Sequence, residues 1–270
     1  MNRLLAALPG PHRPTEAVAA GPTLPQILRG RLPAANLPIG LAATRPLAID
    51  RPAVAAAFDQ LYAGDGAIAR AYHQGRMART ELVADMSEEQ MAADNGAPPA
   101  ASLPAAAQRL ARLIVRDRDI RLAFVALGGW DTHVRQGGAT GQLAGRLRPL
   151  GDGLAAFAQE LGGAWRDTVA VVISEFGRTV HENGDGGTDH GHGNAIWIMG
   201  GAVQGGHIYG DWPGLASAAL YQNRDLAVTT DYRSVLAAII ARHLRLPDRA
   251  LAEIFPGFTP PSSQLDKIIA

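Results

Sequence analysis

Two short motifs in the second half of the chain concentrate side chains that can bind a metal ion. One is Asp131-Thr-His133, and the other is Asp189-His-Gly-His192. Side chains two apart on an extended backbone point the same way, so each motif can present its ligands together. The chain has no cysteine, so a metal would have to be held by His, Asp or Glu. The sequence therefore predicts a metal site or a polar catalytic site made of Asp131, His133, Asp189, His190 and His192.

The donor set restricts the choice of metal. A mixture of oxygen and nitrogen ligands suits zinc or manganese, whereas calcium and magnesium prefer shells of oxygen, and iron is less excluded than those two. We therefore expect a divalent metal cofactor, zinc or manganese before calcium. The simpler interpretation of isolated histidines near strand ends, such as His181, His207 and His243, is that they are hydrogen-bonding loop residues.

A third loop, Ser174 to Thr179, adds Glu175 and Arg178. Glu175 is predicted as a further ligand or a base. The planar guanidinium of Arg178 can bind a phosphate or sulfate group in two places. The alternative is an ion pair between these two residues within one tight turn. The glycines of residues 184–193 resemble a phosphate-binding loop only loosely, and the pattern GxxxxGK[ST] is absent, which disfavours nucleotide binding of that type.

Apolar runs precede two of the three loops. Residues 120–127 and 168–173 are predicted to be buried strands. The residues between them predict a helix, because apolar side chains recur at alternating steps of three and four. These are Leu143, Leu147, Leu150, Leu154, Phe157 and Leu161. A strand, helix and strand in succession join parallel neighbours, so both loops are expected at the carboxyl edge of one sheet, where such sheets bind ligands.

The histidine-rich loop differs because it precedes its strand, residues 195–199. It can join the other two loops only if this strand is antiparallel to them or if the loop returns to their edge. Further along, Thr229 to Arg233 is predicted to open a helix, with Thr230 or Asp231 capping the free amides.

The first part of the chain is organised differently. Prolines interrupt residues 1–50, which predicts an irregular segment with a helical turn at 24–28 and an edge strand at 37–41. Helices are predicted at 51–62, 67–93 and 104–116. We therefore expect an irregular segment at 1–50, a helical segment at 51–118 and an α/β core at 119–270. The basic residues near the last of these helices are better explained by a solvated face than by an anion site: Arg109, Arg112, Arg116 and Arg118.

Composition limits the classes of function. The chain has 270 residues, 47% of them hydrophobic, enough for one sizeable core. Its 25 basic and 25 acidic side chains balance, which argues against nucleic acid or an anionic membrane as a partner. The apolar runs are far shorter than the ~20 residues that span a bilayer, and the first residues do not predict a secretory signal. We therefore expect a small-molecule substrate bound in a defined site.

Several motifs, taken in order, resemble those of one bacterial family, known as domain of unknown function 1501. They are residues 128–133, 174–179, 187–193, 205–210 and 230–233. The resemblance covers essentially the whole chain. That family is similar to the alkaline phosphatase and sulfatase superfamily, metal-dependent hydrolases of phosphate and sulfate esters on an α/β sheet, and its members are commonly exported by the twin-arginine route.

The resemblance implies roles for individual residues. Asp131 and His133 would match the superfamily's Asp and His pair for one metal. Glu175 would stand in the place of an Asp ligand, with Phe176 as a non-ligand. The remaining ligand would come from the second motif, as Asp189, His190 or His192.

The chain departs from the family at its beginning. Full-length members resembling it open with a signal, a strand ending in Arg-Gly-Gly-x-Asp-Gly and a Ser-His-Phe segment near the superfamily's hydroxyl nucleophile, and none of these occurs here. The resemblance is therefore to the carboxyl portion, which implies that one metal-binding Asp and the nucleophile are absent.

We expect an α/β fold with a mainly parallel sheet flanked by helices, alkaline-phosphatase-like but lacking its N-terminal strand. The expected function is hydrolysis of phosphate or sulfate esters, with an incomplete site that shows little turnover. An exposed strand edge would favour self-association. Two alternatives remain: a non-catalytic metal- or ligand-binding fragment, and a hydrolase that uses metal-bound water on another bond.

Overall fold

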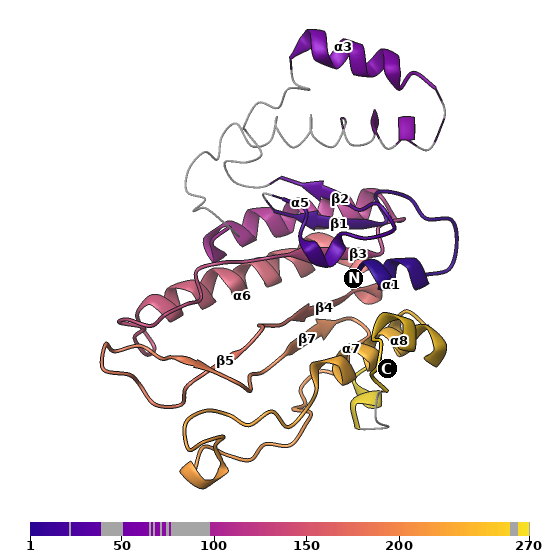
Figure 1. The fold of residues 1–270 in the computed structure, drawn as a ribbon. Coiled ribbons are helices and arrows are strands. Elements are labelled where there is room, and N and C mark those ends of the chain that lie inside the picture. Colours follow the sequence, from indigo (N-terminus) through magenta and orange to yellow (C-terminus); the bar gives the residue numbers. More distant parts are fainter. Residues whose placement is uncertain are drawn as a thin grey trace. The chain divides into compact units, whose positions relative to one another are not determined.

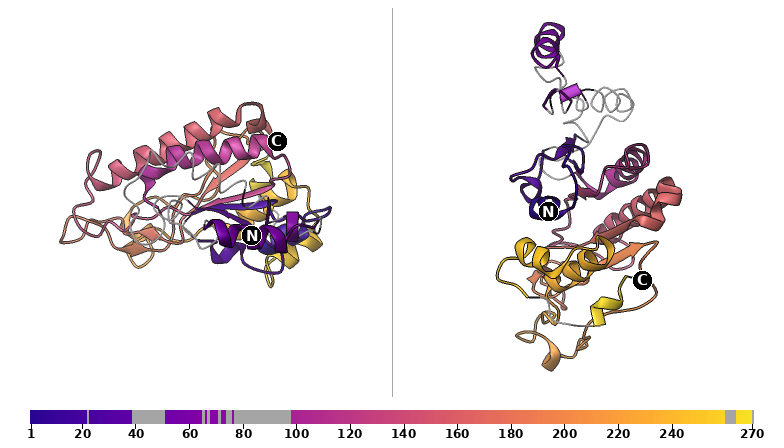
Figure 2. Two further views of the ribbon diagram at one scale, coloured as in Figure 1. Left: turned by 90° about the horizontal axis from the view of Figure 1, so that it is seen from above. Right: turned by 90° about the vertical axis from the view of Figure 1, so that its right-hand side faces the viewer.

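The computed structural model forms two compact units, Met1–Gly128 and Gly129–Ala270, whose elements are shown in Figures 1 and 2. Both units mix helices and strands. The structure describes residues 1–21, 23–38, 51–64, 66, 68–70, 72–73, 76, 98–259 and 264–269. No helix in these ranges is long and apolar enough to cross a membrane.

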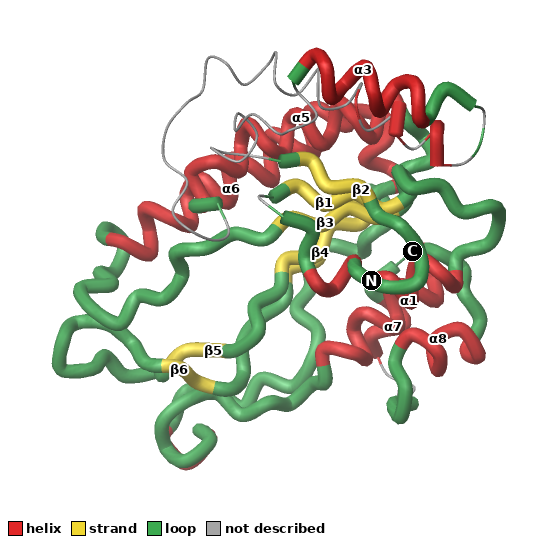
Figure 3. The backbone as a smooth tube through the Cα atoms, turned by 45° about the horizontal axis from the view of Figure 1, so that its top comes forward, coloured by secondary structure: helices red, strands yellow, loops and turns green. Residues whose placement is uncertain are grey.

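Unit 1 contains a small parallel sheet (Figure 3). Strand β1, Ala17–Ala20, lies between β2, Ala35–Leu37, and β3, Leu122–Val125. All four residues of β1 are buried. The helix α5, Leu103–Arg116, packs Ala106 against Ala20 and Val125 of this sheet. The strand predicted at 120–127 and the helix predicted at 104–116 are therefore both present.

The prolines predicted an irregular segment at residues 1–50, but the structure shows regular elements in it. These residues contain α1, Asn2–Ala7, as well as β1, the 3-10 helix η1, Gln26–Leu28, and β2. The expected helical turn is η1. The edge strand β2 lies before the predicted residues 37–41 and shares only Leu37 with them, and Pro38, which follows it, has no N–H for a ladder. Residues 39–50 lie outside the described ranges. Because β1 pairs with β3, the expected loss of a strand does not leave β3 without a parallel partner.

The helical segment is described only in part. Helix α3, Pro52–Leu61, matches the helix predicted at 51–62 and has a proline in its first turn. The helix predicted at 67–93 lies mostly outside the described residues, although residues 68–70, 72–73 and 76 are helical. The 3-10 helix η3, Ala100–Ser102, leads into α5.

Unit 2 begins with a long helix and a two-stranded sheet. Helix α6, Gln142–Leu161, and the 3-10 helix η4, Gly162–Asp167, precede β4, Val169–Val172. Strand β7, Trp197–Gly200, pairs with β4 in antiparallel register. The antiparallel alternative for the strand after the histidine-rich loop is thus the one observed. The predicted parallel pairing of β3 with β4 would involve one strand from each unit, so it stays a prediction. The apolar stripe of α6 is interrupted at Leu147, which is 40% exposed.

The core of unit 2 forms against the β4–β7 sheet. Helix α7, Tyr232–His243, contributes Val235 and Ile239, which pack with Ile268 and with apolar side chains of both strands. As predicted, Asp231 caps α7, because its carboxylate accepts a hydrogen bond from Arg233 N at 2.8 Å. The other elements of this unit are β5, Gly177–Arg178; β6, His190–Gly191; η5, Ser217–Ala219; α8, Asp248–Ile254; and η6, Gln264–Lys267.

Candidate metal centre

Backbone pairing within unit 2 brings the two ligand motifs together. Arg135 N donates to Asp185 O at 2.9 Å and Gln136 N donates to Gly186 O at 2.8 Å. Thr188 N donates to Thr132 O at 3.2 Å. These bonds join the segment after Asp131 to the segment before Asp189, although the bonded residues are 50 or more positions apart in the sequence. The meeting of the motifs is therefore fixed by main-chain hydrogen bonds rather than by side chains alone.

Strands β5 and β6 place a second loop beside the same motifs (Figure 3). They pair in antiparallel register, with Arg178 opposite His190. Directly opposed residues of such a pair have neighbouring side chains. The loop that was predicted to carry Glu175 and Arg178 is thus next to the histidine-rich motif.

Two residues between the motifs make this close approach possible. A Cβ atom on Gly187 would lie 2.1 Å from the carbonyl oxygen of His133, so no side chain fits at that position. The side chain of Asn183 joins the same segments, since Nδ2 donates to His133 O and to Asp189 Oδ1, each at 3.0 Å. Glycine in this loop therefore allows packing of backbone on backbone, which the loose resemblance to a phosphate-binding loop did not anticipate.

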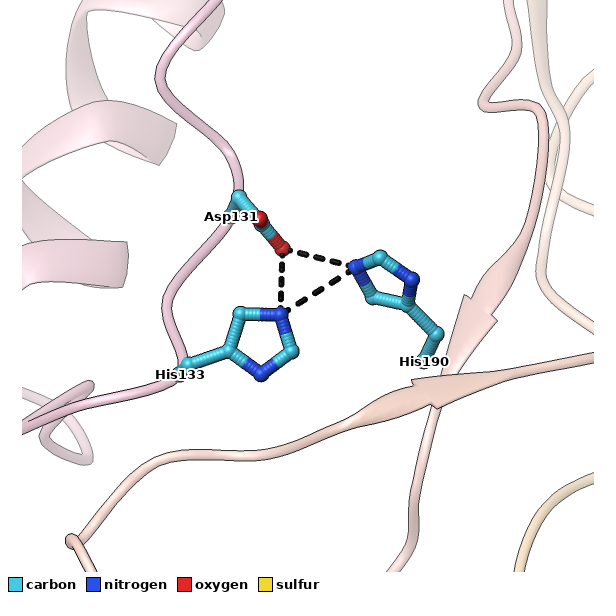
Figure 4. Close-up of side chains that lie close together, drawn as sticks. All are labelled: Asp131, His133 and His190. Atoms are coloured by element: carbon cyan, nitrogen blue, oxygen red, sulfur yellow. Dashed lines mark hydrogen bonds and ion pairs between the residues drawn. The ribbon is translucent and has the colours of Figure 1, made fainter.

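Three of the predicted ligands converge on one point (Figure 4). Asp131 Oδ1 lies 2.9 Å from His133 Nε2 and 2.9 Å from His190 Nε2. The two Nε2 atoms are 3.2 Å apart. Figure 4 shows Asp131 and His133, from one loop, and His190, from β6, with their side chains directed toward one another.

The spacing of these atoms fits a divalent cation. Ligands about 2.0–2.1 Å from a zinc ion are about 3.3 Å apart at tetrahedral angles and about 2.9 Å apart at right angles. The separations of 2.9, 2.9 and 3.2 Å fall in that range. Two imidazoles and one carboxylate on one face leave the other positions of the metal open, as in catalytic zinc sites and non-haem iron sites. The residues present could thus hold a metal ion, but they do not identify it.

His133 is oriented by a carboxylate on its other nitrogen. Nδ1 of His133 lies 3.0 Å from Asp189 Oδ1. A hydrogen bond from Nδ1 to Asp189 leaves the lone pair of the neutral ring on Nε2, the atom that faces the cluster. Hydrogen bonds from Asn183 and from His133 lower the pKa of Asp189, so it is ionised and able to accept. Asp189 was predicted as a ligand, and in the structure it is the hydrogen-bonding partner of His133, a member of the candidate cluster.

The guanidinium of Arg178 bonds Asp131 and Thr188 rather than Glu175. Its Nη1 donates to Asp131 Oδ1 at 2.7 Å, and Nε donates to Thr188 Oγ1 at 3.0 Å. Hydrogen bonds from His190 and from Arg178 lower the pKa of Asp131 to about 2. The carboxylate is therefore charged at neutral pH and suited to bind a cation. Glu175 is exposed, and none of the hydrogen bonds or ion pairs found in the described ranges joins it to Arg178 or to the cluster.

His192 lies two residues from His190 but has a different partner. Its Nδ1 lies 2.9 Å from Asp225 Oδ2, and its main-chain N donates to the same oxygen at 2.6 Å. Asp225 is fully buried. Burial by itself would raise the pKa of Asp225, but the hydrogen bonds from His192 and the charge of Arg224 keep it below its ordinary value. The imidazole packs against the ring of Tyr221 at an interplanar angle of 57°, with ring centroids 4.4 Å apart.

Several residues that shape the site were not predicted from the sequence. Asn183, Thr188 and Asp225 each bond a predicted site residue. Gln136 joins the loops by accepting from the hydroxyls of Thr132 and Thr188, at 2.7 and 2.8 Å. A signal existed only for Asn183, which begins an Asn-Gly-Asp-Gly-Gly stretch typical of a turn.

The fold and the site define an α/β protein with a candidate metal centre on paired loops. The sequence belongs to one family, described as protein of unknown function (DUF1501), which matches residues 22–255. The family resemblance carried by the ordered motifs is thereby confirmed, whereas the likeness to phosphatases and sulfatases stays a prediction. No curated protein and no solved structure matches the chain significantly.

Proposed function

We propose that the protein is a metal-dependent hydrolase of phosphate or sulfate esters, in which Asp131, His133 and His190 hold the cation. The observation that supports this proposal is the convergence of their three ligand atoms, 2.9–3.2 Å apart. When bound, a divalent cation supplies Lewis-acid polarisation of an ester oxygen and makes water or a hydroxyl group a stronger nucleophile.

The surrounding residues have separate tasks in this proposal. Asp189 keeps His133 in the tautomer that presents a lone pair at Nε2. Arg178 holds the Asp131 carboxylate and places a fixed positive charge beside the site. That charge would attract an anionic ester and stabilise charge that develops on it. Glu175 and His192 stay predicted as a further ligand or base on the same loops.

Water is the nucleophile that this arrangement favours. The hydroxyls of Thr132 and Thr188 both donate their proton to Gln136 Oε1. Thr132 is also buried, at 2% exposure. Neither hydroxyl is therefore positioned to attack an ester, and attack by water needs no side-chain nucleophile.

Turnover of simple aryl esters tests the proposal. The metal-free full chain is supplied with zinc, manganese or iron(II) and assayed with 4-nitrophenyl phosphate and 4-nitrophenyl sulfate. We expect metal-dependent release of nitrophenol that His190→Ala reduces at least about 100-fold, because one ligand is lost. His207→Ala removes an exposed histidine outside the cluster and should leave the rate within twofold. Equal rates in wild type and His190→Ala would contradict the proposal.

The alternative is a domain that binds metal without catalysing a reaction. Glu175, the predicted base, is exposed, and none of the hydrogen bonds or ion pairs of the described residues joins it to the cluster, which favours this alternative. Metal binding that depends on His190, together with no hydrolysis of either ester, would support this alternative.

A further inference from the structure

Unit 1 contains a pocket that is separate from the metal centre. Two loops line it, residues 9–16 between α1 and β1 and residues 118–121 before β3, around a cavity of about 220 Å³. The main chain of the loops is joined, because Arg121 N and Leu122 N donate to Glu16 O at 2.9 and 3.1 Å. The pocket therefore lies where β1 and β3 begin, at the opposite end of β3 from Gly128.

The acceptor groups of the lining are already used within the protein. Glu16 is only 5% exposed. Its Oε2 atom bonds His12 Nδ1 at 3.0 Å, and its Oε1 atom lies 3.5 Å from Arg121 Nη1. The carboxylate of Asp119 pairs with Arg13. A ligand would thus find few unused acceptors in this pocket.

In contrast, some hydrogen-bond donors of the lining are not used within the protein. Within the described ranges, no hydrogen bond or ion pair involves Arg118, which lines the cavity. The contacts of Arg121 use Nη1, which donates to Pro9 O at 3.2 Å and faces Glu16. Three arginines against two carboxylates leave one positive charge in the lining. The lining of the pocket therefore suits a ligand that accepts hydrogen bonds and carries one negative charge.

We propose that this pocket binds the carboxylate of a small organic acid, with Arg118 as its main partner and Arg121 as the second. A planar guanidinium matches a carboxylate through two parallel hydrogen bonds. The pocket, with a volume of about 220 Å³, has room for a small organic acid. The site is independent of the proposed hydrolase activity, since its residues all belong to Met1–Gly128.

Acetate is the probe, and metal is removed from the full chain beforehand with a chelating resin, so that anions cannot bind to a cation at the metal centre and no soluble chelator competes with acetate. Arginine Nε–Hε resonances of the ¹⁵N-labelled protein are followed while acetate replaces chloride at constant ionic strength. We expect saturable shifts of the Arg118 and Arg121 resonances. Arg118→Ala should weaken acetate binding at Arg121 at least about tenfold, whereas Arg31→Ala, which removes an exposed arginine outside the pocket, should change it less than twofold.

Two results would overturn the assignment. One is acetate binding that Arg118→Ala leaves unchanged, and the other is a shift that grows linearly without saturating. Inorganic phosphate provides a further comparison: saturation by phosphate but not by acetate would show that the pocket is not a carboxylate site. Because Arg118 is exposed and has no partner within the described ranges, its removal should leave the melting temperature unchanged, and this is measured alongside.

Discussion

The hydrogen bond between Nδ1 of His133 and Asp189 decides which ring nitrogen of His133 faces the ligand cluster. An imidazole whose Nδ1–H is bound to a carboxylate presents Nε2 as an acceptor. The third member, His190, is placed instead by its strand, opposite Arg178. At the scale of single residues, the site thus depends as much on the partners of the ligands as on the ligands.

Replacing Asp189 by Asn should weaken metal binding without removing a member of the triad. The amide lacks the charge that favours an Nδ1–H donor, and loss of a residue that orients a metal ligand typically costs about 10- to 100-fold in affinity. Asp185→Asn makes the same charge change on an exposed neighbour and should change affinity less than twofold. Competition with a fluorescent zinc chelator measures both variants, and equal affinities would contradict the role of Asp189.

The period of two in an extended chain predicted that Asp131 lies beside His133 and that His190 lies beside His192. The structure keeps the first pair together in the candidate cluster, whereas only His190 of the second pair joins it and His192 bonds Asp225. Their hydrogen-bonding partners could not be predicted in the same way. Asn183 lies in a stretch typical of a turn, but neither its local sequence nor that of Asp225 indicates which distant residue it bonds. The hydrogen bond from Arg178 to Asp131 was likewise not predicted, because it depends on tertiary structure.

At the scale of elements, the pairing of segments 132–136 and 185–188 is what creates the site. It requires Gly187, because a Cβ there would lie 2.1 Å from both C and O of His133. Gly184, three residues earlier, has nothing within 4 Å of the same position. The two glycines therefore form a matched pair in one loop.

We expect Gly187→Ala to displace the His133 segment and to reduce metal affinity at least about tenfold. The displacement is unavoidable because the obstructing atoms are backbone. Gly184→Ala should bind metal as wild type does. Chelator competition and the ¹H–¹⁵N spectrum of the metal-free protein report the two effects separately. Unchanged affinity in Gly187→Ala would show that the loops are arranged differently.

The cap of α7 makes a prediction about stability and pH. The side-chain hydrogen bond with Arg233 lowers the pKa of Asp231 from 3.8, against the opposing effect of burial. A lowered folded-state pKa contributes stability above 3.8, which is lost as the pH falls through the folded-state value. Asp231→Ala should therefore lower the free energy of unfolding of the domain by about 1 kcal/mol at neutral pH.

Asp231→Asn is the matched control, since asparagine caps a helix about as well as aspartate but does not titrate. Its stability should be close to that of wild type at neutral pH, and the wild type should lose stability relative to it below about pH 3.8. Urea unfolding of the three proteins across pH measures the difference. Parallel pH profiles for wild type and Asp231→Asn would rule out a titrating cap.

Elements with strong signals were predicted and those with weak signals were missed. The cap at Asp231, the helix α6 and the strand β4 follow from cap chemistry and from apolar periodicity. Strand β1 was not predicted from the sequence. Ala17–Ala20 consists of three alanines and one valine, and its stability comes from neighbouring strands on both sides. Such a strand is defined by tertiary context rather than by its own sequence.

At the scale of the whole molecule, apolar side chains on the surface bear on the expectation of self-association. Apolar side chains are exposed along one segment of unit 2, with Ile208 at 95%, Trp212 at 64% and Val228 at 64%. The formal net charge is +0, so electrostatic repulsion between copies is weak. If these side chains form one continuous apolar patch, they would provide a contact between copies, since large apolar patches mark association sites.

We expect the full chain to self-associate in a concentration-dependent way, as sedimentation velocity would show. The double variant Ile208→Ser with Trp212→Ser should weaken association about tenfold or more. Leu61→Ser, which changes a leucine that is 70% exposed elsewhere in the chain, is the control and should have little effect. A monomer at all concentrations, or equal weakening by the control, would contradict this segment as the contact.

Calorimetric titration of the metal-free full chain with zinc and with manganese tests the metal centre most directly. We predict one cation bound per chain at neutral pH, with affinity reduced at least about 100-fold in His190→Ala, because losing a ligand costs more than losing a residue that orients one. His207→Ala should bind as wild type does. Equal binding by wild type and His190→Ala, or no binding of either metal by the wild type, would contradict the metal centre of Asp131, His133 and His190.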